Sequence, residues 1–539
     1  MVRVRRRNRV FDDGTAVAII VGGRSSRRGD LKKWKGSSLS ISLLLEMAVS
    51  GDPDRTAVVC DEIRWTTDDL SRLADGLAKV IRDAGAKTVA YIGTGGAMLP
   101  LLLFASARAG ATFCPLNYRL STTALQQLLD RLPDALVVTD PEYVDIVGAD
   151  FTMLTSEDCG EHAAAAAIAT DSDGASPDQD DTAVLLFTSG TTAQPKAVQL
   201  SHANLLSYIT GTVEFASAAA DDAALVSVPP YHVAGVGAAL SNIYAGRTLV
   251  YLTDFSPREW INLMVSEKVT TATVVPTMLE RIVSALEAEP TPLPALRNLA
   301  YGGSKVPLPL VRKALALLPD VGFANAYGLT ETSSTIAVLT PQDHRDAVQS
   351  DDERVMRRLG SVGKPVPGIE VEIRASHGTV LDAGHPGELF VRGPQVSGRY
   401  ADLGSVLDEQ GWFATKDAAY QDDEGYLFIV GRADDTIIRG GENIAPAEVE
   451  DVLIEHPAVR NVAVVGAQDP EWGQIIVAVV VPEAGERPGE REIREWARQR
   501  LRGSRTPDRV VVADELPTSA TGKVLRRELV QQLSISRKA

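Results

Sequence analysis

The sequence has few cysteines, few aromatic residues and no long uninterrupted apolar run. Its three cysteines, Cys60, Cys114 and Cys159, lie far apart without a CxxC pair, which argues against a disulfide framework or zinc site and favours a reducing compartment. The longest apolar stretch, 98–113, contains Arg108 and is shorter than the ~18 uninterrupted residues that a membrane span needs. We therefore expect a cytoplasmic protein without a transmembrane segment.

The chain carries more acidic than basic residues. Asp and Glu number 71 against 54 Lys and Arg, which gives a formal net charge of −17. Such a surface repels the phosphates of nucleic acids, so we expect no nucleic-acid partner. Hydrophobic residues still make up 45% of the 539 residues, which is enough for a sizeable core and excludes wholesale disorder.

The first 35 residues differ from the rest because they hold eleven basic and three acidic residues. We expect 1–35 to be a basic, disordered extension. Within it, the run 16–33 (AVAIIVGGRSSRRGDLKK) is similar to the N-terminal phosphate loop of nucleotidyltransferases, in which a glycine pair lets backbone amides approach phosphate. A nucleotidyltransferase-like protein is therefore an alternative, although the following residues carry no further signal of that class.

Beyond this extension, amphipathic helical patterns alternate with short apolar runs. Helical spacing is found at 43–49 and 67–84, and strands are expected at 88–92 and 135–139. This alternation favours helices packed on parallel sheets. The stretch 160–181, rich in Ala and then in Asp and Ser, is expected to be a mobile surface connection.

A domain boundary is expected near 431–435 (GRADD). The patterns after it are a strand, a glycine-rich loop, a helix, two strands, a helix and a strand. We therefore expect a first domain over 36–431 and a smaller domain over 432–539.

The strongest chemical signal is the segment 182–196, TAVLLFTSGTTAQPK. A buried strand ends in hydroxyl side chains, one glycine and a lysine, and the amides and hydroxyls of such a turn can surround the oxygens of a polyphosphate. Its spacing differs from that of a G-x-x-x-x-G-K-[ST] loop. The candidate phosphate-binding residues are Thr188, Ser189, Gly190, Thr191, Thr192 and Lys196.

This segment resembles the phosphate loop of the adenylate-forming (ANL) superfamily of AMP-dependent synthetases and ligases, which includes acyl-CoA synthetases, firefly-luciferase-like enzymes and peptide-synthetase adenylation domains. Six further similar motifs follow in the family's order: PPYHVAG (229–235), AYGGSK (300–305), NAYGLTET (325–332), GWFATKDAAY (411–420), GRADDTIIRGGENIAPAEVE (431–450) and PTSATGKVLR (517–526). The chain departs from the family at Lys416, where a glycine is usual, and at Arg399, which interrupts a usual glycine-tyrosine pair.

The resemblance implies a particular α/β fold. It comprises a large N-terminal region of two helix-flanked β-sheets with a small β-barrel-like subdomain, followed by a small mobile α+β C-terminal domain. The small domain would rotate about a hinge at Asp434.

The resemblance also implies the reaction and its cofactors. ATP would activate a carboxylic acid to an acyl-AMP with release of pyrophosphate, and coenzyme A would then take the acyl group. Because this chemistry brings an anion against a polyphosphate, the site needs positive charge, which Lys523, Lys196 and a magnesium ion would supply. Glu331 and Thr188 would hold the Mg²⁺.

Further residues follow from the matching motifs. The nucleotide is expected at Gly302, Gly303, Ser304, Asn325, Ala326, Tyr327, Gly328, Thr330, Asp417 and Arg432. The pantetheine arm of coenzyme A is expected at Gly440, Gly441 and Trp472, because glycines leave room for a thin chain.

The expected acid is apolar, either fatty or aryl. Relatives that activate amino acids place an acidic residue where this chain has Tyr231-His232, and an unpaired buried ammonium would cost several kcal/mol. The expected acyl pocket consists of His232, Val233, Ala234, Gly235, Ala238 and Gly302.

Two alternatives within this fold stay open. One is a fatty-acyl-AMP ligase that loads a carrier protein, although no long insertion lies between Glu331 and Gly387. The other is a non-catalytic nucleotide-binding protein. The expected partners are the acid, ATP and coenzyme A, and a homodimer is left open.

Overall fold

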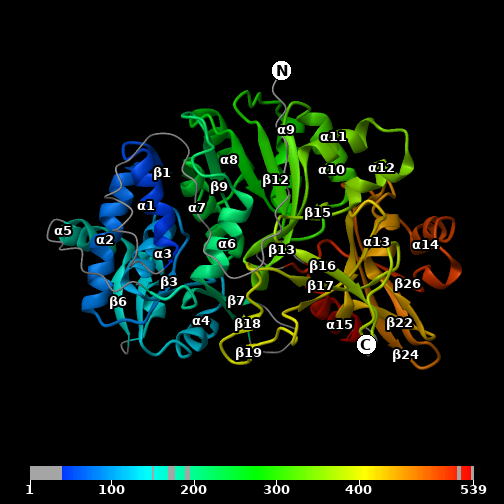
Figure 1. Cartoon of the computed structure of the whole chain (residues 1–539). Helices are drawn as coiled ribbons and strands as arrows, with labels where there is room; N and C mark the ends of the chain where they lie inside the picture. The colour runs from blue at the N-terminus through cyan, green and yellow to red at the C-terminus, as the bar shows by residue number, and fades with distance from the viewer. Residues whose placement is uncertain (1–38, 149–150, 168–176, 189–194, 519–523, 536–539) are drawn as a thin grey trace, which may run out of the picture. The chain divides into compact units, whose positions relative to one another are not determined.

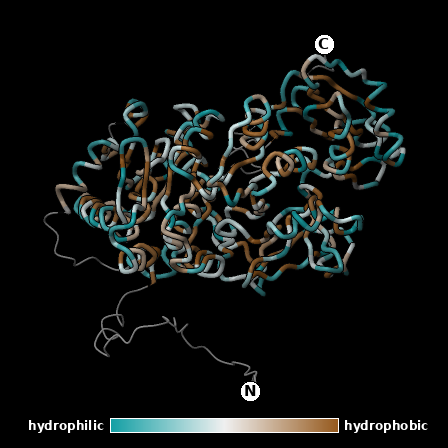
Figure 2. The backbone as a smooth tube through the Cα atoms, turned by 90° about the horizontal axis from the view of Figure 1, so that it is seen from above, coloured by the Kyte–Doolittle hydropathy of each residue, from teal (hydrophilic) through white to brown (hydrophobic). Residues whose placement is uncertain are grey.

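The computed structural model describes residues 39–148, 151–167, 177–188, 195–518 and 524–535, so the predicted extension 1–35 lies outside the described part. Within that part the chain forms four β-sheets with helices packed around them (Figure 1). Hydrophobic stretches recur along these elements (Figure 2). No described helix is long and apolar enough to cross a bilayer.

One sheet has eight strands in the order β19-β18-β8-β7-β4-β3-β5-β6. The neighbours β7, β4, β3, β5 and β6 run parallel, whereas β8 is antiparallel to β7. A strand that is buried on both faces has a continuous run of apolar residues in its sequence, as at 88–92. The strands are β3 (Thr88–Ile92), β4 (Thr112–Leu116), β5 (Ala135–Thr139), β6 (Thr152–Thr155), β7 (Thr182–Thr188), β8 (Lys196–Ser201), β18 (Arg399–Tyr400) and β19 (Gly404–Ser405).

A second sheet has nine strands in the order β15-β14-β13-β12-β11-β9-β10-β1-β2. Its strands β13, β12, β11, β9, β10 and β1 are parallel. The strands are β1 (Thr56–Cys60), β2 (Ile63–Thr66), β9 (Ala223–Val226), β10 (Thr248–Tyr251), β11 (Thr271–Val274), β12 (Asn298–Gly302), β13 (Gly322–Leu329), β14 (Ser334–Leu339) and β15 (Lys364–Pro365).

Helices bury their apolar faces on both sheets. The largest core joins strands of both sheets through α1 (Ser42–Gly51), α2 (Thr67–Asp83), α3 (Met98–Ala109) and α7 (Val233–Ala245). The longest apolar run of the sequence, 98–113, covers α3 and the start of β4, and residues 99–107 of α3 are all buried. The other helices of this region are α4 (Thr122–Leu129), α5 (Ser156–Ala167), α6 (His202–Thr212), α8 (Pro257–Ser266), α9 (Pro276–Ala288), α10 (Leu308–Leu317), α11 (Pro341–Gln349) and α12 (Glu353–Arg357).

A third sheet is small and antiparallel, in the order β16-β17-β20-β21. A β-barrel-like subdomain is expected beside the two large sheets, and the structure shows a four-stranded sheet, whose buried side chains form a core of their own. The strands are β16 (Glu370–Arg374), β17 (Gly387–Arg392), β20 (Phe413–Gln421) and β21 (Leu427–Arg432).

The C-terminal residues form the fourth sheet with its own core. The predicted order of strand, loop, helix, two strands, helix and strand is found, with one further strand and one further helix. The elements are β22 (Ile437–Arg439), β23 (Glu442–Ile444), α13 (Pro446–Leu453), β24 (Val459–Asp469), β25 (Gly473–Pro482), α14 (Glu490–Arg498), β26 (Arg509–Val512) and α15 (Arg526–Ile535). The boundary between 431 and 432 stays a prediction.

The structure corrects the expectation of a surface connection over 160–181 for its first residues, and 168–176 lie outside the described residues. Residues 160–167 belong to α5, and Cys159 and Ala163 are fully buried on its inner face. Alanine is the best helix former, and the four-residue spacing places these two side chains on one face. The predicted helices and strands at 43–49, 67–84, 88–92 and 135–139 are confirmed, as is the α/β fold class.

Candidate active site

The described ends of the predicted phosphate loop lie on neighbouring strands. Thr188 ends β7 and Lys196 begins β8, and the two residues are cross-strand partners. The Thr188 hydroxyl lies 3.5 Å from the Lys196 carbonyl oxygen. The Lys196 ammonium lies 5.3 Å from the ring centroid of Tyr400, so a cation stands at the edge of the predicted loop.

A carboxylate joins this cation from a distant segment. Glu331 lies in a short 3-10 turn, η3 (Thr330–Thr332), directly after β13. The Tyr400 hydroxyl donates to Glu331 Oε1 at 2.7 Å. Lys196, Tyr400 and Glu331 therefore meet although they come from three separate parts of the sequence.

A second carboxylate is held at both of its oxygens. The Tyr327 hydroxyl donates to Asp417 Oδ2 at 2.5 Å, and Arg432 Nη1 donates to Asp417 Oδ1 at 2.8 Å. Asp417 and Arg432 are cross-strand partners on β20 and β21. Because each carboxylate oxygen can accept two hydrogen bonds, Asp417 keeps acceptor sites for a pair of ribose hydroxyls. Burial and the neighbouring Asp417 raise the pKa of Tyr327, so its hydroxyl stays a donor at neutral pH.

The candidate nucleotide-binding glycines Gly302 and Gly328 are explained by close backbone packing. A Cβ on Gly302 would lie 2.1 Å from the Ala326 carbonyl oxygen, and one on Gly328 would lie 1.7 Å from the Ser334 carbonyl oxygen. The close approach of adjacent backbones therefore requires glycine at both positions. Neither glycine needs a ligand to explain it.

The other nucleotide candidates surround the ends of β12 and β13. Gly303 and Ser304 follow β12, and Thr330 begins η3. Ala326 pairs with Gly302 across the two strands. The side-chain amide of Asn325 donates a hydrogen bond to the Ser361 carbonyl oxygen at 3.1 Å. Their roles toward a nucleotide stay predictions.

The predicted acyl pocket residues lie at the start of α7. His232 caps this helix, and its Nδ1 accepts a hydrogen bond from the Ala234 amide at 3.2 Å. Burial lowers the pKa of His232, which favours the neutral ring. Val233 and Gly235 are buried, whereas Ala234 and Ala238 lie one turn apart on a partly exposed face. The role of these residues toward an acyl group stays a prediction.

The predicted pantetheine residues come together in the C-terminal sheet. The Gly440 amide donates to the Trp472 carbonyl oxygen at 2.8 Å, and a Cβ on Gly440 would lie 3.0 Å from the Trp472 ring. The Arg439 guanidinium lies 4.5 Å from the centroid of that ring. Gly441 has a φ of +85°, and a Cβ there would meet no heavy atom within 4 Å. The hinge candidate Asp434 lies nearby in the chain, in η5 (Ala433–Asp435).

Five predicted site residues lie outside the described residues: Lys523, Ser189, Gly190, Thr191 and Thr192. Their roles stay predictions.

The described residues of this site fit a magnesium ion only if substrate phosphates supply part of its ligands. Among the described residues no cluster of three or more His, Cys, Asp or Glu side chains could hold a metal. Mg²⁺ that binds with substrate phosphates needs only one or two protein carboxylates, because phosphates and water fill the other positions. Glu331 in η3 and Thr188 at the end of β7 carry oxygen donors of this kind, and their roles toward Mg²⁺ stay predictions.

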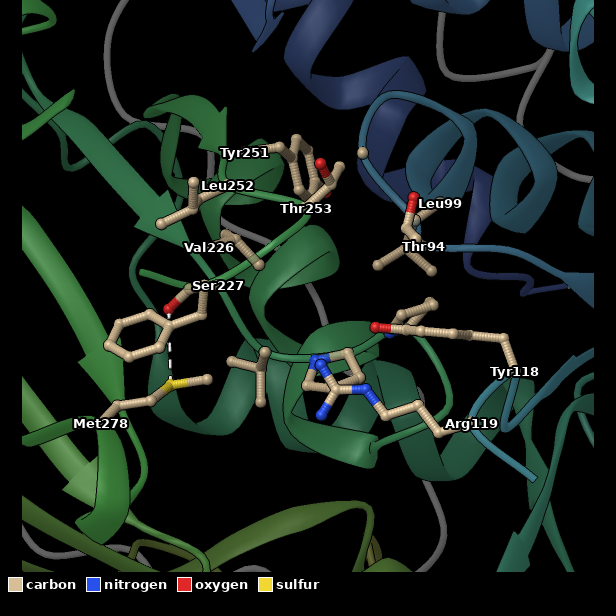
Figure 3. Close-up of a pocket in the computed structure, with 16 residues that line it drawn as sticks. Thr94, Leu99, Tyr118, Arg119, Val226, Ser227, Tyr251, Leu252, Thr253 and Met278 are labelled. Atoms are coloured by element: carbon tan, nitrogen blue, oxygen red, sulfur yellow. Dashed lines mark hydrogen bonds between the residues drawn. The ribbon is translucent and has the colours of Figure 1, made fainter. Parts of the chain in front are cut away.

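A separate small cavity lies where β3, β9 and β10 end (Figure 3). It has a volume of about 20 Å³, the room of roughly one water molecule. Tyr118 and Arg119 extend into it from one side, and Ser227 and Met278 lie on the other. None of the acyl pocket candidates lines it.

Two family models match this chain, one after the other along the sequence. The "AMP-binding enzyme" model matches residues 45–401, and the "AMP-binding enzyme C-terminal domain" model matches 448–523. The chain belongs to the AMP-binding enzyme family. The family predicted from the seven motifs is thereby confirmed.

Several relatives match over nearly their full length. Feruloyl-CoA synthase from Amycolatopsis sp. is 35% identical over 88% of this chain and 96% of the relative. Indoleacetate–CoA ligase from Aromatoleum aromaticum is 32% identical over 89% and 96%. Among solved structures, ATP-bound MatB from Rhodopseudomonas palustris has a TM-score of 0.80 at 26% identity, covering 92% of this chain and 99% of that chain.

The structure adds one residue that the sequence analysis did not place in the site. Tyr400 connects Lys196 and Glu331, whereas the pair Arg399-Tyr400 stood out in the sequence only as a departure from the family pattern. The signal for Tyr400 in the sequence was its position shortly after Gly398, which matches the usual glycine-tyrosine pair of the family except for the intervening Arg399.

Proposed function

We propose that the chain joins an apolar carboxylic acid, fatty or aryl, to coenzyme A at the expense of ATP, which leaves as AMP and pyrophosphate. The observation that carries this proposal is the meeting of Lys196, Tyr400 and Glu331 on one side and of Tyr327, Asp417 and Arg432 on the other. The relatives above are named as a feruloyl-CoA synthase and an indoleacetate–CoA ligase, which supports coenzyme A as the acceptor.

Separate groups of residues would bind the ribose and the phosphates of ATP. Asp417 would accept hydrogen bonds from the ribose hydroxyls, with Tyr327 and Arg432 fixing its orientation. Lys196 would balance phosphate charge, and Glu331 would hold a magnesium ion, which lowers the repulsion between the acid and the polyphosphate. Lys523 would add a second positive charge where the acid oxygen meets the α-phosphorus. Catalysis of this kind depends on positioning and electrostatics.

In the second step, coenzyme A would reach the acyl-adenylate beside Gly441. Its sulfur attacks the acyl carbon, the bond from that carbon to the phosphate oxygen breaks, and AMP leaves. The thiol proton passes to solvent. Trp472, which is 42% exposed, would cover the pantetheine arm.

An aryl acid is the favoured substrate. Relatives at 30–35% identity are named for ferulate, indoleacetate and 2-succinylbenzoate. Neutral His232 and the small residues Ala234 and Ala238 leave an uncharged, open face that fits a flat ring. No cation in this set would pair with a second acid group.

An acid panel tests this proposal. We expect AMP release that requires both coenzyme A and an acid, with kcat/KM at least tenfold higher for hydroxycinnamic and arylacetic acids than for amino acids, because the pocket residues carry no partner for an ammonium. Coupled measurement of AMP gives the rates. AMP release from amino acids alone would contradict the assignment of the pocket.

A carrier protein is the second candidate acceptor. A fatty acid–[acyl-carrier-protein] ligase, ScoC from Streptomyces coeruleorubidus, is 31% identical over 89% of this chain. The same assay with a phosphopantetheinylated carrier protein in place of coenzyme A separates the two. Faster transfer to the carrier protein would favour this candidate.

Asp417 provides a prediction about ATP. Asp417→Asn should raise the KM for ATP by about 10- to 100-fold, because a charged acceptor of several hydrogen bonds is lost and Arg432 loses its partner. Steady-state rates at varied ATP measure this change.

Asp343→Asn is the matched control for this variant. Asp343 accepts a hydrogen bond from the Tyr426 hydroxyl at 2.6 Å outside the site, much as Asp417 does from Tyr327. An equal rise of the KM for ATP in both variants would remove Asp417 from the nucleotide site.

We also propose that the enzyme works in the cytoplasm. The three cysteines are all buried and unpaired, as expected in a reducing compartment. A homodimer stays a prediction.

A further inference from the structure

We infer that Tyr400 is the positioning residue that sets Glu331 for magnesium, and that the segment 395–401 clamps this carboxylate relative to Lys196. The inference rests on the proposed function for the identity of the nucleotide. The sequence motifs assigned no role to Tyr400.

Tyr400 contacts both charged groups of the phosphate side. Its hydroxyl donates to Glu331 Oε1 at 2.7 Å, while its ring lies 5.3 Å from the Lys196 ammonium. The residue is 7% exposed. A tyrosine hydroxyl keeps its proton in the neutral range, so it can donate this hydrogen bond.

The backbone of Glu331 is held by the same segment. The amides of Ser397 and Gly398 donate to the Glu331 carbonyl oxygen at 2.9 and 3.3 Å. Glu331 is thus fixed at its carbonyl group and at its carboxylate by residues only three positions apart.

The turn after Glu331 is strained and is held by a buried amide. Ser333 and Ser334 have φ values of +56° and +106°, and residues other than glycine rarely adopt a positive φ. The Gln395 side chain is 3% exposed and donates to the carbonyl oxygens of Thr332 and Thr335 at 3.0 and 2.9 Å. The backbone carbonyl oxygen of Gln395 accepts a hydrogen bond from the Ser333 hydroxyl at 2.8 Å.

The clamp is anchored on the strand that carries the cation. Tyr400 on β18 pairs with Val198 on β8, and the Ala401 amide donates to the Ala197 carbonyl oxygen at 2.9 Å. Lys196 begins this same strand. The distance between the cation and the carboxylate is therefore set by one short segment, with Tyr400 at its end.

A magnesium ion that bridges substrate phosphates and a single protein carboxylate depends strongly on where that carboxylate points, because Mg²⁺ requires near-octahedral geometry. The hydroxyl of Tyr400 binds Oε1 of Glu331, so Oε2 is the oxygen that would be offered to a magnesium ion. Without this hydroxyl the carboxylate can rotate, so ATP binding should lose part of its dependence on magnesium.

The test is titration calorimetry of ATP with and without Mg²⁺, which needs neither acid nor coenzyme A. We expect Tyr400→Phe to lower the factor by which Mg²⁺ tightens ATP binding by about tenfold and to leave magnesium-free binding within about twofold. The control is Tyr426→Phe, because Tyr426 also donates to a carboxylate and lies under two cations, Arg358 and Lys364, outside the site. This variant should keep the full magnesium effect.

A double-mutant cycle with Glu331→Gln shows whether Tyr400 acts through Glu331. The double variant should show no smaller magnesium effect than Glu331→Gln alone, because the effects of residues that act together are not additive. Additive losses, an unchanged magnesium effect in Tyr400→Phe, or unfolding of this variant while Tyr426→Phe stays folded would each overturn the inference. If no acid is ever activated while this pattern holds, the proposed function fails and the inference stands.

Discussion

Lys523→Ala is expected to lower acid-dependent exchange of pyrophosphate into ATP by about 10³-fold or more, the effect of removing a cation that stabilises a phosphoryl-type transition state. Attack by coenzyme A on a supplied acyl-adenylate should be nearly unchanged, because that step forms no bond at phosphorus. The exchange assay and a single-turnover thioester assay measure the two steps separately.

Lys313→Ala is the matched control, because Lys313 forms a surface ion pair with Glu287 and lies outside the site. It should leave both steps unchanged. Full exchange activity in Lys523→Ala, or an equal loss in the two steps, would remove Lys523 from the adenylation step.

Gly441→Leu should produce the opposite pattern. Exchange should be retained, while thioester formation should fall by about 10²-fold or more, because the side chain would fill the space left open beside the Gly440–Trp472 contact. Gly440 is less suitable for this test, since a Cβ there would press on the Trp472 ring and disturb the fold directly.

Gly485→Leu controls for backbone strain. Gly485 has a φ of +88°, close to the +85° of Gly441, and a Cβ there would also meet no heavy atom within 4 Å. A leucine at 485 should therefore cost as much strain and leave both steps intact. Equal loss of thioester formation in the two variants would mean that strain, and not a blocked path, is the cause.

Local patterns in the sequence were enough to predict much of the fold. Helix α2 has its apolar residues at helical spacing after a Thr66–Asp69 capping box, and β3 is a short apolar run between turns. The motif order also placed Asp417 and Arg432 in one site, and the structure brings them within 2.8 Å.

Contacts between distant segments could not be predicted in this way. The bridge from Tyr400 to Val198 joins residues about 200 positions apart, and neither local pattern contains information on the other. The backbone of Lys416, which lies within β20, could not be predicted from the sequence either. Its φ of +65° shows why glycine is usual there, but the lysine itself gives no sign of a left-handed backbone.

The fate of a labelled acid oxygen tests the central claim most directly. In the proposed reaction a carboxylate oxygen attacks the α-phosphorus, and the bond to pyrophosphate breaks. The sulfur of coenzyme A then displaces AMP, which keeps that oxygen. With an aryl acid labelled with ¹⁸O at both carboxylate oxygens, mass spectrometry should find one ¹⁸O in AMP for each thioester formed. Unlabelled AMP, or label in inorganic phosphate, would contradict the formation of an acyl-adenylate.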